Sequence, residues 1–324
     1  MNKKEIGWGI IGCGNVTEVK SGPAFQKAQG SRLIAVMRRN AALAEDYAKR
    51  HNVKKWYADA DQLINDSEVD AVYIATPPSS HKDYTLKAAA AGKPVYVEKP
   101  MAMNYPECLE MIDACEKMRI PLYVAYYRRS LPRFLKVKEL LDEDQIGKIR
   151  FVTVTLCKPP FPDDIEGREN WRVIPEIAGC GYFCDLASHT VDLLQYLLGD
   201  IIDAKGFSEN QLKLYEAEDV ISATFKFQSA IVGAGLWNFN AYGNIDRNEV
   251  IGDKGRIIFS TFDHQPTILE TENSIQKFNI EHPKHIQQPL IQNIVDELLG
   301  RGSSPSTGYS GSKTNLVMDM ILGR

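Results

Sequence analysis

Hydrophobic runs of strand length alternate with helical patterns over the first 125 residues of the chain. The runs are rich in β-branched and aromatic residues, which favour strands. Strands are predicted at 5–11, 32–37, 54–57, 70–75, 94–97 and 121–124. Helices are predicted near 40–50, 59–66, 80–91 and 104–118, after a first helix that Pro23 divides in two. Regular alternation of this kind predicts an α/β fold with a doubly wound parallel sheet.

The pattern changes after residue 125, where strand-like runs become longer and follow one another directly. Turn signals such as 252–255 (Gly-Asp-Lys-Gly) separate them. Strands are predicted at 149–156, 220–227, 230–239, 249–251 and 256–260, with helices near 181–198, 285–300 and 312–322. The sequence therefore predicts an α/β domain over 1–125 and an α+β domain with a mainly antiparallel sheet over 126–324.

A glycine-rich turn follows the first strand. Its residues are Gly12, Cys13, Gly14, Asn15, Val16 and Thr17, a G-x-G-x-x-G pattern with threonine in place of the third glycine. Gly12 would permit the tight turn, and Gly14 would let a pyrophosphate approach the backbone. The phosphates would then bind at the start of the next helix, at Asn15 and Val16. The alternative is an ordinary glycine-rich turn.

The second predicted strand ends in Arg38 and Arg39. A site that prefers NAD usually carries an acid here to bind the ribose hydroxyls, and this chain has none between Glu18 and Glu45. Two guanidinium groups suit a 2′-phosphate, so the sequence favours NADP(H), with NAD(H) possible. The alternative is a solvated basic pair before a helix that Asn40 caps.

Two further strand ends carry candidate chemistry, because ligands of open α/β sheets bind beyond the carboxyl ends of the strands. Thr76, Pro77 and His81 follow the strand at 70–75 and are predicted to contact the cofactor, with Ser80 as a helix cap. Glu98 and Lys99 follow the strand at 94–97, where the lysine can hold a charge beside a bound ligand. The alternatives are a packing role for the histidine and a surface Glu-Lys pair.

The helix predicted at 181–198 carries Asp185, His189 and Asp192. The first two lie four residues apart and would share one helix face. A carboxylate can orient an imidazole, which makes His189 a candidate general acid or base. The alternative is a buried histidine with a structural role. Two ligands do not complete a metal site, so no metal is predicted.

Composition places the chain among ordinary globular proteins. It has 324 residues, 44% hydrophobic and 25% charged, and a net charge of −4 without a basic block, which argues against nucleic acid as a partner. No apolar run reaches membrane-spanning length, and the first strand begins without a signal-like segment, so a cytoplasmic location is expected. The six scattered cysteines are expected to be reduced thiols.

Taken together, these motifs resemble the Gfo/Idh/MocA family, which takes in glucose–fructose oxidoreductase and inositol 2-dehydrogenase. The matching motifs are Gly12–Gly14, 75–78 (Ala-Thr-Pro-Pro) with His81, 98–100 (Glu-Lys-Pro), 127–129 (Tyr-Arg-Arg), 171–172 (Trp-Arg), and Gly179, Gly181, Asp185, His189 and Asp192. The resemblance implies an NAD(P)-binding Rossmann domain over 1–125 and, over 126–324, an α+β domain with an open, mainly antiparallel sheet for substrate binding and oligomerisation, commonly as a homodimer or homotetramer. It also implies hydride transfer between a nicotinamide cofactor and a sugar, polyol or related alcohol.

The resemblance also implies roles for single residues. Lys99 matches the family's catalytic lysine, and Asp185 with His189 matches its D-x-x-x-H pair. The substrate side is assigned to Tyr127, Arg129 and Trp171, together with Asp185 and His189. The alternative for Trp171 is a core tryptophan. Two departures, Thr17 and Cys180, replace glycines of the family pattern. Two alternative functions are a glycosidase that retains NAD and a catalytically silent dinucleotide-binding regulator.

Overall fold

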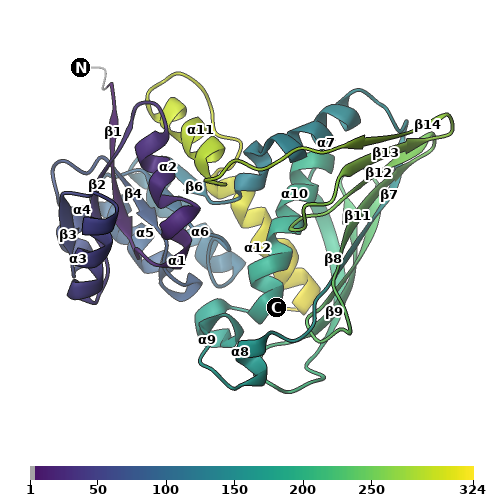
Figure 1. Cartoon of the computed structure of the whole chain (residues 1–324), viewed down its shortest axis with the longest axis horizontal. Coiled ribbons are helices and arrows are strands. Elements are labelled where there is room, and N and C mark those ends of the chain that lie inside the picture. Colours follow the sequence, from purple (N-terminus) through teal and green to yellow (C-terminus); the bar gives the residue numbers. More distant parts are fainter. Residues whose placement is uncertain (1–3) are drawn as a thin grey trace. The chain divides into compact units, whose positions relative to one another are not determined.

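The computed structural model describes residues 4–324 and divides into two compact units (Figure 1). The first unit runs to Leu131 and includes Pro283–Ser312; the second comprises Pro132–His282 and Lys313–Arg324. This grouping differs from the division at residue 125, because a late segment of the chain returns to the first unit. The functional division stays a prediction.

The first unit contains a six-stranded parallel sheet, as predicted. Its strands are β1 (Ile6–Ile11), β2 (Ser31–Met37), β3 (Lys55–Tyr57), β4 (Ala71–Ile74), β5 (Val95–Val97) and β6 (Leu122–Val124), in the order β3-β2-β1-β4-β5-β6. Its helices are α1 (Asn15–Val19), α2 (Gly22–Lys27), α3 (Ala41–Arg50), α4 (Ala60–Ile64), α5 (His81–Ala90), α6 (Tyr105–Lys117) and α11 (Gln288–Leu298), with single turns η1 (Pro78–Ser80) and η2 (Tyr127–Ser130). The predicted break of the first helix at Pro23 is confirmed by the separation of α1 from α2.

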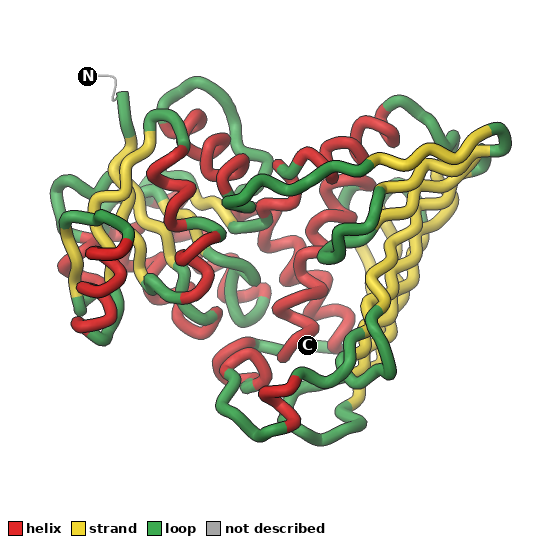
Figure 2. Tube along the Cα trace, viewed as in Figure 1, coloured by secondary structure: helices red, strands yellow, loops and turns green. Residues whose placement is uncertain are grey.

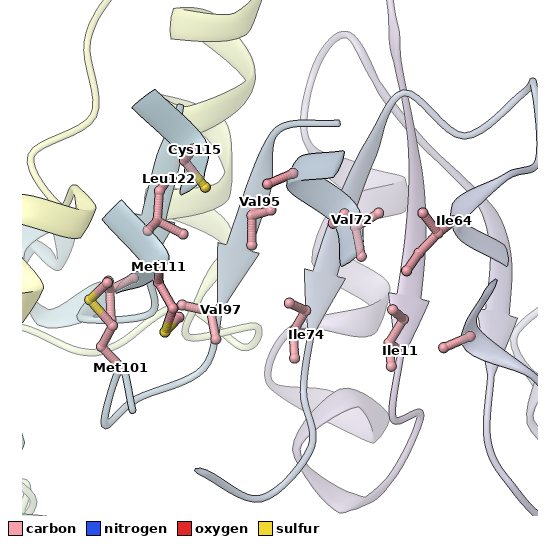
Figure 3. Packing of buried hydrophobic residues seen from close by; sticks show 14 of the residues in the cluster. Ile11, Ile64, Val72, Ile74, Val95, Val97, Met101, Met111, Cys115 and Leu122 are labelled. Carbon is pink, nitrogen blue, oxygen red and sulfur yellow. The ribbon is translucent and has the colours of Figure 1, made fainter. Parts of the chain in front are cut away.

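Alternating side chains of the central strands build a core on each face of this sheet. Val72, Ile74, Val95 and Val97 point to one face and pack with residues of α5 and α6 in a fully buried cluster (Figure 3). Burying one such side chain stabilises the fold by about 1.5–3 kcal/mol. The intervening tyrosines point to the opposite face, toward α2. The two cores fix the strand register, and with it the positions of the loops at the carboxyl edge.

The second unit contains an eight-stranded sheet in the order β14-β13-β12-β11-β7-β10-β9-β8. Its strands are β7 (Ile149–Cys157), β8 (Ile201–Glu209), β9 (Val220–Phe227), β10 (Val232–Asn238), β11 (Ile245–Gly252), β12 (Gly255–Phe259), β13 (Thr267–Thr271) and β14 (Ser274–Phe278). Every pair is antiparallel except β10 with β7, so the mainly antiparallel sheet is confirmed. The strands β8, β13 and β14 were not predicted.

Helices cover only one face of this sheet (Figures 1 and 2). The unit contains α7 (Pro132–Asp142), α8 (Pro162–Ile165), α9 (Pro175–Ala178), α10 (Ser188–Leu198) and most of α12 (Gly308–Leu322), with short turns η3 (Trp171–Val173) and η4 (Phe183–Ala187). Helix α7 was not predicted. Within residues 4–324 no helix combines the length and the apolar character needed to cross a bilayer.

The predicted helix at 181–198 is not uniform, and two cysteines near its start form a disulfide. Residues Phe183–Ala187 form a π-helical turn, and regular α-helix begins at Ser188. Cys180 and Cys184 are joined in a disulfide, which corrects the expectation of six thiols. Their spacing of four residues brings the Cα atoms to 5.1 Å, within the range for a disulfide. Four further cysteines, Cys13, Cys108, Cys115 and Cys157, are buried and form no disulfide within the described residues.

Candidate active-site groups

The glycine-rich turn has the geometry that its two glycines predict. Gly12 has a φ of +92°, and a Cβ on it would lie 2.7 Å from Cγ2 of Thr76. A Cβ on Gly14 would meet only the Gly12 carbonyl oxygen at 3.9 Å, so the space outside this residue is open. Helix α1 begins at the next residue, Asn15, which is exposed, and Val16 is half-buried. The turn therefore leaves room for a group that approaches its backbone closely.

Thr17, which replaces the third glycine of the motif, is accommodated in the glycine-rich turn. The side chain is fully buried, and its Oγ1 donates a hydrogen bond of 2.8 Å to the Gly14 carbonyl. The close helix packing expected of the third glycine occurs instead at Gly22, where a Cβ would lie 2.2 Å from the Thr17 carbonyl oxygen and from the Tyr47 hydroxyl. That hydroxyl donates a 2.8 Å hydrogen bond to the same carbonyl. Sequence reasoning missed Gly22, although it lies five residues beyond the motif.

A cluster of charged and polar side chains links α1 to the end of α3, and it was not predicted from the sequence. Arg50 donates to both oxygens of the Glu18 carboxylate at 2.7 and 2.8 Å, and Nε2 of His51 lies 2.8 Å from Oε2. These hydrogen bonds lower the pKa of Glu18 to about 2, and the hydrogen bonds from Arg50 have the largest effect. The cluster holds the helix that follows the glycine-rich turn.

Arg38 and Arg39 are exposed at the end of β2. Within residues 4–324 neither guanidinium pairs with a carboxylate, so both charges are available to a ligand. Burial raises the pKa of the Cys13 thiol to about 11, and the nearby charge of Arg38 opposes that rise. Arg38 therefore lies close enough to the glycine-rich turn to act on it. Asn40 caps α3 as predicted, accepting a 3.2 Å hydrogen bond from the Leu43 amide.

His81 is enclosed by backbone carbonyls. Its Nε2 lies 2.8 Å from the Thr76 oxygen, and its Nδ1 lies 3.0 Å from the Pro100 oxygen. Burial lowers the pKa of this imidazole. The imidazole ring therefore connects the loop after β4 with the loop after β5. Its predicted contact with a cofactor, like those of Thr76 and Pro77, stays a prediction.

Ser80 occupies the predicted N-cap position of α5, but the side-chain capping hydrogen bond does not form. Its side chain accepts no hydrogen bond from α5; instead its hydroxyl donates toward the Thr76 hydroxyl at 2.8 Å and the Pro77 carbonyl at 3.0 Å. The reason is the 3₁₀ turn η1, which extends the helical rise back to Pro78 and leaves no free first turn for Ser80 to cap.

Glu98 is buried directly after β5, and Lys99 beside it is half-buried. The carboxylate accepts hydrogen bonds from the Tyr73 hydroxyl at 2.5 Å and from Nε2 of Gln287 at 2.6 Å. Its other oxygen accepts from the backbone amide of Lys99 at 3.2 Å. The alternative prediction, a surface Glu-Lys pair, is therefore wrong, because Glu98 is buried. Sequence reasoning missed Gln287, because no pattern links positions 189 residues apart.

Tyr127 and Arg129 lie in the turn η2 and are both buried. Nη1 of Arg129 donates a 2.9 Å hydrogen bond to the Pro305 carbonyl, which anchors the returning segment of the first unit. The guanidinium of Arg128 lies over the Tyr127 ring, 5.1 Å from its centre. The predicted substrate contacts of these residues stay predictions.

The second unit carries the other candidate groups on η4 and α10. Asp185 is half-buried in the π-helical turn, and His189 is buried in α10. The π-turn changes the angular spacing, so the assumption of 3.6 residues per turn holds only from Ser188 onward. Nε of Arg172 lies 3.3 Å from Oδ2 of Asp185. Sequence reasoning gave Arg172 no role, although it is adjacent to Trp171.

Trp171 is half-buried, so it is not a core residue of the second unit. The guanidinium of Arg172 lies over its ring, 4.6 Å from the centre. Asp192, by contrast, is completely buried within α10. Among the described residues no three or more His, Cys, Asp or Glu side chains gather in a way that could hold a metal ion.

A loop after β12 lies against His189 and was not foreseen. The Phe262 ring meets the imidazole edge-on, with centres 5.9 Å apart, and the hydroxyls of Thr190 and Thr261 lie 3.2 Å apart. The Asp246 carboxylate accepts from the backbone amides of 261, 262 and 263 at 2.9, 2.5 and 2.9 Å. The loop is therefore a fixed neighbour of the candidate acid or base.

Comparison with known proteins agrees with this architecture. Residues 6–126 match a family described as oxidoreductases with an NAD-binding Rossmann fold, and residues 134–258 match the GFO/IDH/MocA C-terminal domain. The chain is 41% identical to Oxidoreductase P35 of Formosa agariphila over 99% of both chains. It is 28% identical to scyllo-inositol 2-dehydrogenase (NAD(+)) of Bacillus subtilis, over 82% of this chain and 77% of that protein.

A solved structure shares the fold. Levoglucosan dehydrogenase, in complex with NADH and levoglucosan, superposes with a TM-score of 0.87 at 22% identity, over 98% of this chain and 96% of that one. The chain belongs to the Gfo/Idh/MocA family of NAD-binding oxidoreductases.

Proposed function

We propose that this protein transfers hydride between a nicotinamide dinucleotide and a sugar, a polyol, or a related alcohol or ketone. One observation carries the proposal: Arg38, Gly12 and Lys99 follow β2, β1 and β5, so all three lie at the carboxyl edge of one parallel sheet. The strand order reverses between β1 and β4, and ligands of open α/β sheets bind at such a reversal. The activities named for scyllo-inositol 2-dehydrogenase and levoglucosan dehydrogenase support a cyclic polyhydroxy substrate.

The residues present fit a dinucleotide. The open space outside Gly14 admits a pyrophosphate, and the amides at Asn15 and Val16 would hold it at the start of α1. When bound, the dinucleotide supplies the hydride acceptor or donor of the reaction. Thr76, Pro77, His81 and Glu98 would line the same edge of the sheet.

Lys99 and His189 would act on the reacting oxygen. During oxidation of an alcohol, the imidazole of His189 would take the hydroxyl proton while the ammonium of Lys99 stabilises the negative charge that develops on that oxygen. Asp185 would orient the imidazole or bind a neighbouring hydroxyl. The guanidinium of Arg172, 3.3 Å from Asp185, supports a fixed carboxylate in that role.

Tyr127, Arg129 and Trp171 are proposed to contact the substrate. Trp171 has one face covered by the guanidinium of Arg172 and remains half-exposed, which suits stacking against the C–H face of a sugar ring. Tyr127 and Arg129 are more enclosed, so their contacts would be limited to groups that reach into the loop after β6.

NADP(H) is proposed as the preferred cofactor, and NAD(H) as the weaker one. The support is the pair of exposed, unpaired guanidinium groups at Arg38 and Arg39, in the position where an acid would favour NAD. A 2′-phosphate would accept charge-assisted hydrogen bonds from them.

A homodimer or homotetramer is proposed to form through the uncovered face of the eight-stranded sheet. Phe151, Val232 and Leu236 are exposed there, and the strand register places Phe151 opposite Val232. The face also holds a hollow of about 560 Å³ lined by residues of β7, β8, β9 and β10. A large exposed apolar face in one chain is typical of an interface. Size-exclusion chromatography with light scattering, on the wild type and on Val232→Lys, tests this assembly.

A cytoplasmic location is proposed as well. Its support is the proposed need for a free nicotinamide dinucleotide. The cysteines do not decide the compartment, because four carry no disulfide whereas Cys180 and Cys184 are joined in one. Fractionation of cells that make the protein would test it.

The experiment for the function is turnover with a panel of sugars and cyclic and open-chain polyols. Purified protein is mixed with oxidised or reduced NADP and NAD, and absorbance of the reduced nicotinamide is followed. Net cofactor turnover that depends on the added substrate supports the proposal. Hydrolysis of a glycoside with retained dinucleotide and no net turnover would favour a glycosidase, and inactivity on the whole panel would favour a regulator.

A further inference from the structure

Four polar side chains form a closed network beneath the end of β5, here named the Glu98 network. Its members are Tyr73 on β4, Tyr96 on β5, Glu98 and Gln287. Tyr73, Tyr96 and Gln287 are completely buried, and Glu98 is 7% exposed. The two tyrosine rings stack with centres 4.8 Å apart, and Phe25 of α2 packs on them at 5.2 and 6.4 Å. A carboxylate in such surroundings is stable only if donors satisfy it.

The hydrogen bonds of the network lead from the Tyr96 hydroxyl through the Gln287 amide to the Glu98 carboxylate. The Tyr96 hydroxyl donates to Oε1 of Gln287 at 2.8 Å, which orients the amide so that its NH₂ group faces Glu98. That NH₂ group and the Tyr73 hydroxyl then donate to Oε1 of Glu98 at 2.6 and 2.5 Å. Oε2 is left to accept from the Lys99 amide at 3.2 Å. The donors thus fix which carboxylate oxygen faces Lys99.

Gln287 is itself held in place by its backbone. Its amide donates to the Lys20 carbonyl at 3.2 Å, and its carbonyl accepts from the Ile291 amide in the first turn of α11 at 3.0 Å. The neighbouring His285 approaches the Val19 carbonyl at 2.7 Å through Nδ1. The segment that carries Gln287 is therefore anchored beside the end of α1, within the same unit as β5.

We propose that Gln287 and Tyr73 are positioning residues for Lys99, acting through Glu98. They hold one oxygen of the carboxylate, and the other oxygen fixes the backbone from which the lysine side chain extends. The inference rests on the proposed function, in which Lys99 contacts the reacting oxygen. Loss of a donor would leave a buried charge partly unsatisfied, so the carboxylate and the lysine backbone would shift together.

The groups that face Glu98 keep their protonation at neutral and mildly alkaline pH. Burial raises the pKa of Tyr73 and of Tyr96 well above the ordinary tyrosine value, so both hydroxyls remain donors. Tyr127 acts on Tyr96 in the same sense. Burial lowers the pKa of His81, which therefore stays neutral. Lys99 contacts Glu98 through its backbone amide, and a new pH dependence that appears in Gln287→Glu but not in Tyr73→Phe can be traced to the carboxyl group introduced.

Gln287→Glu gives the sharpest test. It replaces a donor by a second carboxylate, 2.6 Å from the first in the present geometry, and two carboxylates at that distance must share one proton. At mildly acidic pH the shared proton restores a hydrogen bond, whereas at higher pH the two charges repel. The matched control is Gln292→Glu on α11, where the amide contacts Gln29 and donates to the Asp296 carboxylate at 3.1 Å, so the same change creates a carboxylate pair that is not hydrogen-bonded to Glu98.

Two measurements follow across pH. The first is trace acetylation of Lys99 by acetic anhydride, read by mass spectrometry relative to Lys87, an exposed lysine of α5 that serves as the internal reference, with melting temperatures to exclude unfolding. The second is kcat and KM for the cofactor and for an active substrate. For Gln287→Glu we expect a changed Lys99 labelling rate and a kcat lowered about ten- to a hundredfold at mildly alkaline pH, both approaching the wild type at mildly acidic pH. Gln292→Glu should match the wild type throughout.

Tyr73→Phe provides a second variant if Gln287→Glu does not fold. It removes one donor without adding charge, and we expect a loss in kcat of about tenfold without the new pH dependence. Wild-type labelling of Lys99 and wild-type kcat in the folded variants at every pH would overturn the proposal. Altered labelling in a protein that turns over no substrate would keep Gln287 as a positioning residue for Lys99 and defeat the proposed function instead.

Discussion

Replacing Arg38 and Arg39 should remove a preference for NADP over NAD. Both side chains are exposed at the end of β2, and within residues 4–324 neither forms an ion pair. A phosphate that binds them therefore does not have to break an existing salt bridge. The predicted change falls on NADP affinity, because NAD lacks the 2′-phosphate.

The magnitude follows from one or two charge-assisted contacts. Each hydrogen bond to a charged group contributes about 1.5–3 kcal/mol, equivalent to about ten- to a hundredfold in affinity. Exposure of both guanidinium groups places the effect toward the lower end, because solvent and salt screen them. We expect about tenfold weaker NADP binding in each single alanine variant and loss of the preference in the double variant.

Titration calorimetry with NADP and NAD measures this directly. Arg32→Ala is the control, since Arg32 is an exposed arginine at the opposite end of β2 that pairs with Glu5 at 3.1 Å. The NADP preference should also shrink as salt is raised. Equal affinity of the wild type for both cofactors, or a preference that survives the double substitution, would refute the reasoning.

Three further predictions concern the reacting groups and the anchoring of α1. Lys99→Met should lower kcat about a hundred- to a thousandfold in steady-state assays while calorimetry shows little change in cofactor binding; a near-wild-type rate would make Lys99 structural. His189→Ala should abolish the limb near neutral pH in the profile for oxidation, and Asp185→Asn should shift it, with melting temperatures to exclude unfolding; an unchanged limb in a folded variant would remove the histidine. Glu18→Gln should lower the free energy of unfolding by about 1 kcal/mol at neutral pH, after allowance for solvent screening. Because its folded pKa of about 2 lies below the ordinary 4.5, this stabilisation is present above about pH 4.5 and is lost as pH falls toward 2, so a difference that persists in acid denaturation curves at the lowest pH would contradict the assignment.

The parallel sheet was predictable because its strands repeat a local pattern. Buried runs such as 70–75 and 94–97 have no competing interpretation once helices of suitable length alternate with them. The Asn40 cap and the break at Pro23 were predictable for the same reason, since each depends on a few adjacent residues. Helix α7 could have been predicted, because Phe134, Val137 and Leu140 recur at helical spacing; all three are buried.

Other features depend on contacts that no local pattern encodes. The edge strand β14 has exposed residues along nearly its whole length, so it lacks the alternation by which a strand is detected. The π-turn at Phe183–Ala187 has no known signal in its composition, and it altered the geometry assumed for Asp185 and His189. Gln287 joins Glu98 only because the chain returns to the first unit after the second sheet. The candidate residues could thus be named from the sequence, but the partners that hold them could not.

Transfer of deuterium is the most direct test of the proposed chemistry. The protein is incubated with reduced NADP that carries deuterium at both hydrogen positions of nicotinamide C4 and with the ketone of an active sugar or polyol, and the product is analysed by mass spectrometry. The account predicts a product that carries one deuterium on the reduced carbon, with formation that depends on Lys99. A product without deuterium, or deuterium transfer that is undiminished in Lys99→Met, would contradict it.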